Sequence, residues 1–166
     1  ADSLGNYAVL LHGVKQHYDK AQEYYKRAVA AEPNHTNNLG NYALFLAEVR
    51  SEHKQAEKLY LQAINSNPHH ANSLYNYGVL LDSAYQNYDE AEKYYKRAIE
   101  VNPGHAYSLY NYAVLLEEVR KDYDQAQKLF QRAIAASPKD PLALGDYGNF
   151  LKSVRKDYDG AEVMYK

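Results

Sequence analysis

The stretch Ala71–His105 reads ANSLYNYGVLLDSAYQNYDEAEKYYKRAIEVNPGH, and the rest of the chain consists of copies of it. When the sequence is shifted by 35 residues in either direction, the same residue types return at the same places. Agreement at one spacing over several residue types indicates a repeat protein. The recurring positions are Leu4, Leu39, Leu74, Leu109 and Leu144; Tyr7, Tyr42, Tyr77, Tyr112 and Tyr147; Ala21, Ala56, Ala91, Ala126 and Ala161; and Pro33, Pro68, Pro103 and Pro138.

The bulk composition bounds the class of protein. The 166 residues hold just under five repeats and carry a formal net charge of -2, which argues against a dedicated nucleic-acid binder because such proteins usually present a strongly basic face. No apolar run approaches the roughly 18 residues that predict membrane insertion. The absence of cysteine excludes disulfides and thiolate zinc sites. We therefore expect a soluble protein, cytoplasmic by default and extracellular if it is part of a filament.

The first segment of each repeat is predicted to be a helix because its apolar residues fall three and four positions apart. This stripe contains Leu74, Tyr77, Leu80, Leu81 and Ala84 in one repeat. The next repeat has Leu109, Tyr112, Leu115, Leu116 and Val119 at the same places.

A second helix is expected to begin at an Asp that caps free backbone amides, followed three residues later by Gln or Glu, which is typical of a capping box. In the second repeat His53 and Lys54 replace the usual Tyr-Asp, so a weaker helix start is expected there. The helix should end before Pro103, which cannot continue the hydrogen-bond ladder. The expected capping residues are Asp19, Asp89, Asp124 and Asp159, and the expected inward residues of one such helix are Tyr94, Tyr95, Ala98 and Ile99.

Over its whole length the chain resembles the tetratricopeptide repeat family. Its first helix carries Leu74, Tyr77, Gly78 and Leu81, and its second carries Ala91, Tyr95, Ala98 and Pro103, which fill the places of the family pattern. The resemblance implies an all-α, right-handed superhelical solenoid of antiparallel helix pairs. The single domain 1–166 would hold repeats at about 1–35, 36–70, 71–105, 106–140 and an incomplete 141–166.

Each repeat departs from the family pattern in three ways. Leu replaces the usual first aromatic residue, the Tyr and Leu of the first helix are exchanged, and each repeat has one residue more than the family's usual length of about 34. We place that additional residue between the two helices, at His17, Glu52, Asn87, Asp122 and Asp157. The pentatricopeptide family shares the longer repeat and reads single-stranded RNA, but a negatively charged chain offers little to counter phosphates.

By the same resemblance the first helices line a concave groove that contacts partners. An Asn side chain both donates and accepts, so a row of them can hold an extended peptide backbone, although Asn there can equally bind water or the next helix. The predicted partner-binding residues are Asn6, Asn41, Tyr75, Asn76, Tyr107, Tyr110 and Asn111, with Asp146 in the fifth repeat and Val9, Leu44, Val79, Val114, Glu48, Asp82, Glu117 and Glu118 nearby.

The family's clamp for the carboxylate of chaperone tails needs Lys and Arg in the groove. At the matching positions this chain has no basic residue, so no chaperone carboxylate clamp is expected. Those positions hold Gly5, Gly40, Asn37, Asn72 and Asn76.

Other patterns that carry chemistry elsewhere are weak in this sequence. Stacked helices lie about 8 to 10 Å apart, so one metal ion cannot join the recurring His35, His70 and His105. Residues 157–160 resemble only part of a calcium loop, and Asn34-His35-Thr36 is a glycosylation sequon of a kind that chance produces readily in an Asn-rich chain. Because carboxylates and histidines fall at repeat-determined places, we expect no enzyme, no cofactor and no metal site.

Two functions follow as hypotheses. The first is a scaffold that binds a protein or peptide along the groove. The alternative is a structural protein, a homo-oligomer whose repeats stack end to end across chains into an extended superhelix or filament. Its basis is that the sequence starts on a typical first helix and stops at Met164-Tyr165-Lys166, so either both ends are uncapped or flanking repeats cover them.

Overall fold

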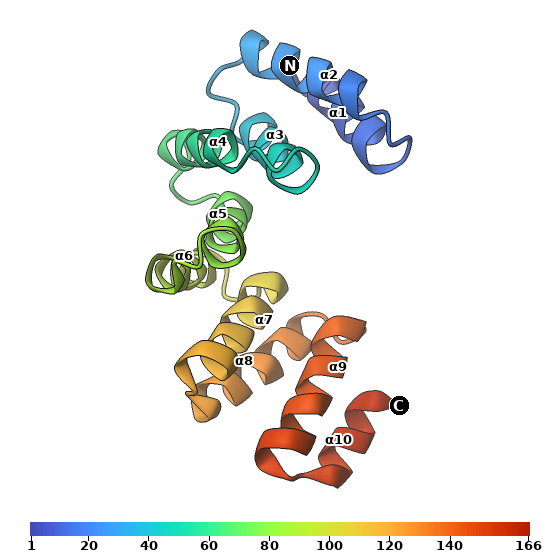
Figure 1. The fold of residues 1–166 in the computed structure, drawn as a ribbon, viewed down its shortest axis with the longest axis vertical. Helices are drawn as coiled ribbons and strands as arrows, with labels where there is room; N and C mark the ends of the chain where they lie inside the picture. Colours follow the sequence, from blue (N-terminus) through green and yellow to red (C-terminus); the bar gives the residue numbers. More distant parts are fainter. The chain divides into compact units, whose positions relative to one another are not determined.

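The computed structural model describes residues 1–166 and is 80% helical with no strands, which confirms the all-α prediction (Figure 1). Ten α-helices follow one another, and two of them continue into a π-helical turn. The helices are α1 (Asp2–Gly13), α2 (Tyr18–Ala31), α3 (Thr36–Glu48), α4 (His53–Ser66), α5 (Ala71–Ser83), α6 (Tyr88–Val101), α7 (Ala106–Leu115), α8 (Tyr123–Ala136), α9 (Pro141–Phe150) and α10 (Tyr158–Tyr165), and the π-turns are η1 (Leu116–Arg120) and η2 (Leu151–Arg155).

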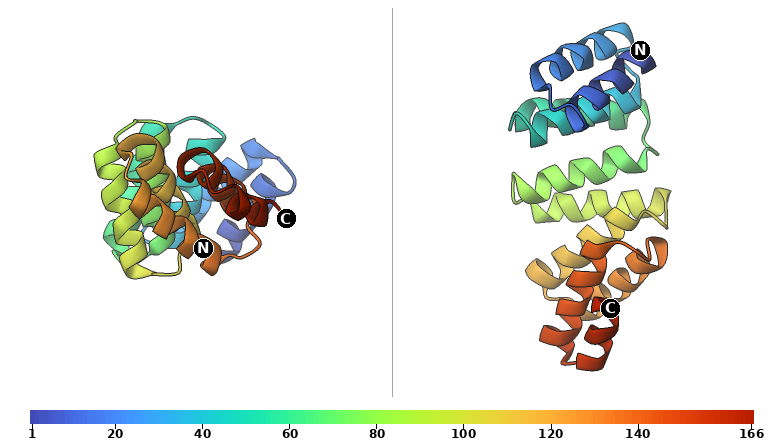
Figure 2. Two further views of the ribbon diagram at one scale, coloured as in Figure 1. Left: turned by 90° about the horizontal axis from the view of Figure 1, so that it is seen from below. Right: turned by 90° about the vertical axis from the view of Figure 1, so that its right-hand side faces the viewer.

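The structure divides into two compact units, Ala1–Tyr94 and Tyr95–Lys166, with the boundary inside α6. In the first unit α1 pairs with α2 and α3 with α4, and α5 packs on α3 and α4. In the second unit α7 pairs with α8 and α9 with α10, and α9 packs on α8. Figure 2 shows that the two helices of such a pair run antiparallel.

The core of the first unit has small residues at recurring buried positions. Ala21 and Ala43 are completely buried, and the large side chains of Tyr25 and Leu39 are at most 1% exposed. Burying a large apolar side chain in this way contributes about 1.5–3 kcal/mol. Since each helix pair covers only part of its own apolar stripe, the stripes are completed by neighbouring pairs within a unit.

The predicted apolar stripes are buried except at their last positions. Leu74 and Leu81 are at most 4% exposed, and Leu109 is fully buried. In contrast, Ala84 and Val119 are exposed because they lie where the first helix ends and the chain turns away from its partner.

A left-handed turn joins the two helices of every pair. One residue in each turn has φ between 52° and 59°, and the residue after it donates its N–H to a carbonyl six positions back, as Asp122 does to Leu116 at 3.0 Å. Left-handed backbone costs a residue other than glycine about 1–2 kcal/mol. The turn residues are Gln16, Ser51, Gln86, Lys121 and Lys156.

The predicted caps of the second helices are wrong. These helices begin at Tyr, or at His53 in α4, and in three of them the residue before the helix supplies the capping side chain. Asn87 accepts from the Glu90 N–H at 3.4 Å, Asp122 from the Gln125 N–H at 3.1 Å, and Asp157 from the Gly160 N–H at 2.9 Å. The left-handed turn shifts the helix start, so the residue that we assigned as additional takes the N-cap position, although the side chains of His17 and Glu52 make no capping bond there. The residues expected as caps, Asp19, Asp89, Asp124 and Asp159, lie in the first helical turn instead.

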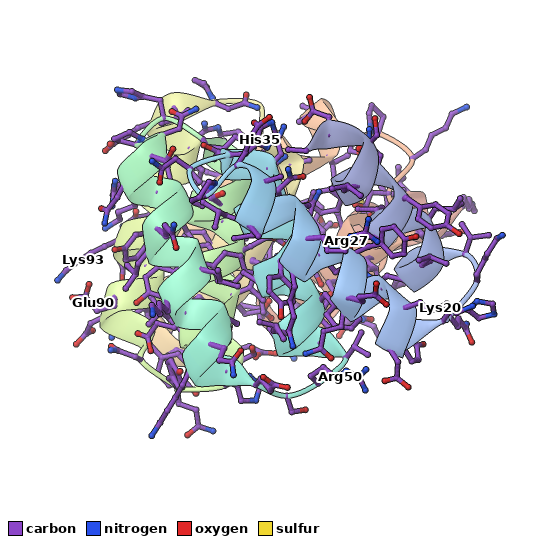
Figure 3. All side chains as sticks on the ribbon, turned by 90° about the horizontal axis from the view of Figure 1, so that it is seen from above. Lys20, Arg27, His35, Arg50, Glu90 and Lys93 are labelled. Carbon is purple, nitrogen blue, oxygen red and sulfur yellow. The ribbon has the colours of Figure 1, made fainter.

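Two of these first-turn aspartates bind an arginine of the following helix pair. Arg50 donates to the Asp19 carboxylate, and Arg155 donates to Asp124 at 2.5 Å. Figure 3 shows Arg50 at the edge of the first unit. A carboxylate at this place is also stabilised by the positive end of the helix dipole.

Histidines cap three of the first helices. The Nδ1 atoms of His35, His70 and His105 accept from backbone N–H groups three residues later at 3.3–3.4 Å, and Asp140 does the same at the fourth such place. The recurring histidines therefore have a defined structural role as helix caps.

Candidate functional site

The first unit contains a hollow of about 290 Å³ on the face made by α3 and α5. Leu44 from α3 and Val79 from α5 are half-buried apolar walls, and Tyr75 and Asn76 supply a phenol ring and an amide. The other residues that line the hollow are Ala47, Glu48, His53, Tyr60, Leu80 and Ser83.

The size of this hollow limits what it can hold. Pockets for small molecules span about 300–1,000 Å³, so this one is at or below their lower limit. It has room for an inserted side chain of a peptide. Tyr60, whose side chain is only 1% exposed, lies beneath it, and burial raises the pKa of the Tyr60 hydroxyl, so that group stays neutral. Exposed Glu48 adds a negative charge at the rim.

His53 and Tyr60 bring α4 into this site, which the sequence reasoning did not anticipate. The His53 Nδ1 atom is buried without a hydrogen-bond partner, and its ring lies 6.5 Å from that of Tyr85. A signal was present in the sequence, because every other repeat has Tyr where the second has His53. The tyrosines at this place are Tyr18, Tyr88, Tyr123 and Tyr158.

In the second unit the predicted partner-binding residues serve partly in structural contacts. The Tyr110 hydroxyl donates to Asp146 at 2.5 Å and so links α7 to α9. The Asn111 amide donates to the carbonyl of Tyr107 at 3.0 Å. Burial and the bonded Asp146 raise the pKa of the Tyr110 hydroxyl. Tyr107 has a side chain with 59% of its surface exposed.

Carboxylates gather on the same face of the second unit. Burial raises the pKa of Glu117, and the nearby charges of Glu118 and Asp146 raise it further. A carboxyl that is harder to ionise because of neighbouring carboxylates lies in a negative potential. The positive charge of Lys121 acts in the opposite direction and lowers the pKa of Glu117.

The remaining predicted residues lie apart from the hollow. Asn6 is exposed on α1 and Asn41 is half-buried on α3. Asn34, the predicted glycosylation residue, is exposed in the turn between α2 and α3, and its backbone carbonyl accepts from Ser66 Oγ at 2.5 Å. The structure thus joins Tyr75 and Asn76 in one site with Leu44, Val79 and Glu48, which were predicted to lie near them, whereas Asn6 and Asn41 do not line it.

Nowhere do three or more His, Asp or Glu side chains gather closely enough to hold a metal ion. None of the helices combines the length and the apolar character that crossing a membrane requires.

Comparison with known families gives matches along almost the whole chain. Three models described as tetratricopeptide repeat match residues 1–35, 59–93, and 83–141 together with 119–164. A model described as Sel1 repeat matches residues 36–68. No curated protein matches the chain.

Several solved structures share the fold. Pseudomonas aeruginosa pilF is 20% identical with a TM-score of 0.87, over 99% of this chain and 72% of that one. TTC0263, a thermophilic TPR protein in Thermus thermophilus, is 17% identical with a TM-score of 0.81, over 99% and 87%. YrrB, described as a TPR protein with an unusual peptide-binding site, is 20% identical with a TM-score of 0.66, over 97% and 80%. At these identities the likeness shows the fold alone.

Proposed function

This chain belongs to the tetratricopeptide repeat family, and we propose that it is a non-enzymatic scaffold that binds an extended peptide segment of another protein along its first helices. Repeats of this family are typical of protein–protein interaction modules. What we propose, beyond membership of the family, is that a peptide binds and which residues it contacts.

The observation that carries this proposal is the hollow between α3 and α5. Its apolar walls, Leu44 and Val79, favour an aliphatic or aromatic side chain, since removing apolar surface from water is favourable. Tyr75 is of the residue type that dominates binding energy at interfaces, because it buries a large rigid ring and keeps a polar end. The hollow therefore fits one anchoring side chain of a peptide.

Asn76 gives the site a second kind of contact. Its amide carries both donors and an acceptor, so it matches the alternating N–H and C=O groups of an extended backbone. Such contacts do not depend on the peptide's sequence, whereas the hollow selects one side chain. YrrB, which is described as a TPR protein with an unusual peptide-binding site, has the same fold and supports this proposal by analogy.

The charges on these faces restrict the peptide's composition. Glu48 lies at the rim in the first unit, and Glu117, Glu118 and Asp146 gather in the second. A peptide with basic or neutral residues is favoured, and an acidic one is repelled.

Selection from a displayed library of random peptides of about twelve residues tests the proposal. An extended peptide of that length is longer than the distance across one helix pair, so it can contact more than one repeat. Selected peptides should share a large apolar residue and basic neighbours, and should lose binding to the Tyr75→Ala and Asn76→Ala chains. Matched controls are Tyr18→Ala and Asn65→Ala, which remove the same groups from helices α2 and α4 away from the hollow. Peptides that bind all four variants equally would contradict a site at α3 and α5.

The structural alternative uses different surfaces. Its support is that consecutive helix pairs pack through one recurring contact, such as Tyr25 on Tyr42 at 5.5 Å, which the end faces of the first and last pairs would continue. Stacking across chains would cover these end faces and leave the hollow accessible. The two functions are therefore compatible.

A further inference from the structure

The place that the hollow occupies is filled by a side chain one repeat earlier in the chain. The imidazole ring of His12 on α1 lies 6.5 Å from the ring of Tyr25 and 5.2 Å from that of Phe45. The Tyr25 hydroxyl hydrogen-bonds the His12 Nδ1 atom at 3.4 Å, and the ring of Tyr18 lies 6.3 Å away. In the first helix pair an imidazole thus has three aromatic rings around it and is bonded to one of them.

In the second helix pair the corresponding imidazole is absent. Ala47 holds the place of His12, 35 residues further along the chain, and lines the hollow. The residues at the places of the three rings around His12 also line the hollow. They are His53, Tyr60 and Leu80. The hollow is therefore the same site with its central side chain reduced to a methyl group.

The loss of the imidazole leaves the Tyr60 hydroxyl without the partner that the Tyr25 hydroxyl has. Tyr60 is 1% exposed, and its hydroxyl forms no hydrogen bond within the protein. Phe130 holds the same place on α8 and is fully buried, so the fold does not need a hydroxyl there. Because an unpaired buried hydroxyl is unfavourable, a group that enters the hollow and pairs with it gains affinity.

The walls of the hollow leave more room than an imidazole fills. Leu80 is smaller than Phe45, and His53 is smaller than Tyr18, at the places that contact the ring in the first pair. The volume of about 290 Å³ therefore admits the larger indole ring as well as an imidazole.

The rim has gained two polar side chains that the first pair lacks. Tyr75 and Glu48 hold the places of Gly40 and Gly13. Burial and, after it, the charges of Glu48 and Tyr75 raise the pKa of the Tyr60 hydroxyl, so both groups lie near it. The negative charge of Glu48 favours an incoming group that donates an N–H.

We propose that the side chain anchoring a peptide in this hollow is an aromatic ring that carries a nitrogen, as in tryptophan or histidine. This inference rests on the peptide-binding function proposed above. The ring takes the place that His12 fills one repeat earlier, and its nitrogen pairs with the Tyr60 hydroxyl. A neutral imidazole accepts from or donates to that hydroxyl, and an indole N–H donates to its oxygen. Leucine or phenylalanine fills the hollow but leaves the hydroxyl unpaired.

Variants of the chain alone test whether the site prefers a ring nitrogen. Ala47→His places an imidazole where His12 stands one repeat earlier, and Ala47→Phe places a ring without nitrogen there. We expect the urea midpoint of the Ala47→His chain, relative to that of the Ala47→Phe chain, to be higher with Tyr60 present than with Tyr60→Phe added to both. Comparing the two backgrounds cancels the different hydrophobicity of the two rings. An unchanged difference would overturn the pairing of a ring nitrogen with Tyr60.

Library-selected peptides test the anchor itself. Peptides that lose binding to the Tyr75→Ala chain should share a tryptophan or a histidine. Replacing that residue of the peptide by phenylalanine should weaken binding to wild type about fivefold, which corresponds to one hydrogen bond, and should change binding to the Tyr60→Phe chain little. The Tyr60→Phe chain should keep the circular dichroism of wild type, because Phe130 holds the same place in its own repeat.

Failure of this inference and failure of the proposed function give different results. Peptides that depend on Tyr75, carry a leucine or phenylalanine anchor and bind the Tyr60→Phe chain as well as wild type would contradict the ring nitrogen and leave the peptide site intact. If no peptide distinguishes the Tyr75→Ala chain from wild type, the peptide site fails, and the Ala47 variants still decide whether the hollow prefers a ring nitrogen.

Discussion

At the scale of single residues, the repeats allow one position to be compared with its own copies. Asn38 is 3% exposed and its Nδ2 atom has no hydrogen-bond partner. The copies of this position hold Ser73 and Ser108, whose hydroxyls lie 2.8 Å from the Nδ1 atoms of His70 and His105. A buried polar atom without a partner costs about 1–3 kcal/mol.

We therefore expect Asn38→Ser to stabilise the protein by about 1 kcal/mol, because it removes the unpartnered amide and supplies a hydroxyl to His35. Urea unfolding followed by circular dichroism measures the change. Asn38→Ala is the control, since it removes the amide without adding the hydroxyl, and it should gain less. A less stable Asn38→Ser chain would show that the amide has a favourable contact.

Stability should also depend on pH through the capping histidines. Burial lowers the pKa of His70 and of His105 below the ordinary 6.5, because the charged imidazolium is poorly solvated there. The folded state therefore prefers the neutral ring, whose Nδ1 atom accepts the capping bond. Their contribution is complete above about pH 6.5 and is lost as the pH falls through their lower folded values.

The matched variant is His70→Asp with His105→Asp, because Asp140 caps α9 at the corresponding place. Between pH 7.5 and about pH 5, wild type should lose more stability than the double variant, as measured by urea midpoints at each pH. The other histidines are common to both chains and cancel in the difference. Parallel pH profiles would count against this role for the two imidazoles.

At the scale of elements, the left-handed turn is the feature that sequence reasoning did not find. The period, the helices and their apolar stripes follow from spacings of three, four and 35 residues, so they could be predicted. The helix starts could not, because Gln16, Lys121 and their copies are not residues that usually signal positive φ. When the turn is not known, the sequence pattern alone favours the Asp after each Tyr as the N-cap, because Asp is a preferred capping residue.

The turn can be tested at Lys121, where φ is 59°. Glycine adopts this conformation without strain and β-branched residues do not, so Lys121→Gly should be more stable than Lys121→Val by about 2 kcal/mol. Exposed Lys139, whose φ is not positive, is the control site. There the same two substitutions should differ little, and an equal difference at both sites would contradict the left-handed assignment.

At the scale of the whole molecule, the site was predicted in part. Tyr75 and Asn76 were predicted because the resemblance to the tetratricopeptide repeat family places them on the groove side of a first helix. The hollow itself depends on α4 placing Tyr60 beneath α5, and contacts between helices are not contained in a local pattern. Likewise Tyr110 looked like a free anchor, although Asp146 of the next pair binds its hydroxyl.

The function argued from this fold rests on whether the hollow between α3 and α5 anchors a peptide. Isothermal titration of a library-selected peptide into wild type, Tyr75→Ala and Tyr18→Ala chains measures this directly. We predict that Tyr75→Ala weakens binding at least about tenfold, as for a residue that anchors an interface, while Tyr18→Ala binds as wild type does. Equal affinity of the wild-type and Tyr75→Ala chains would contradict the claim.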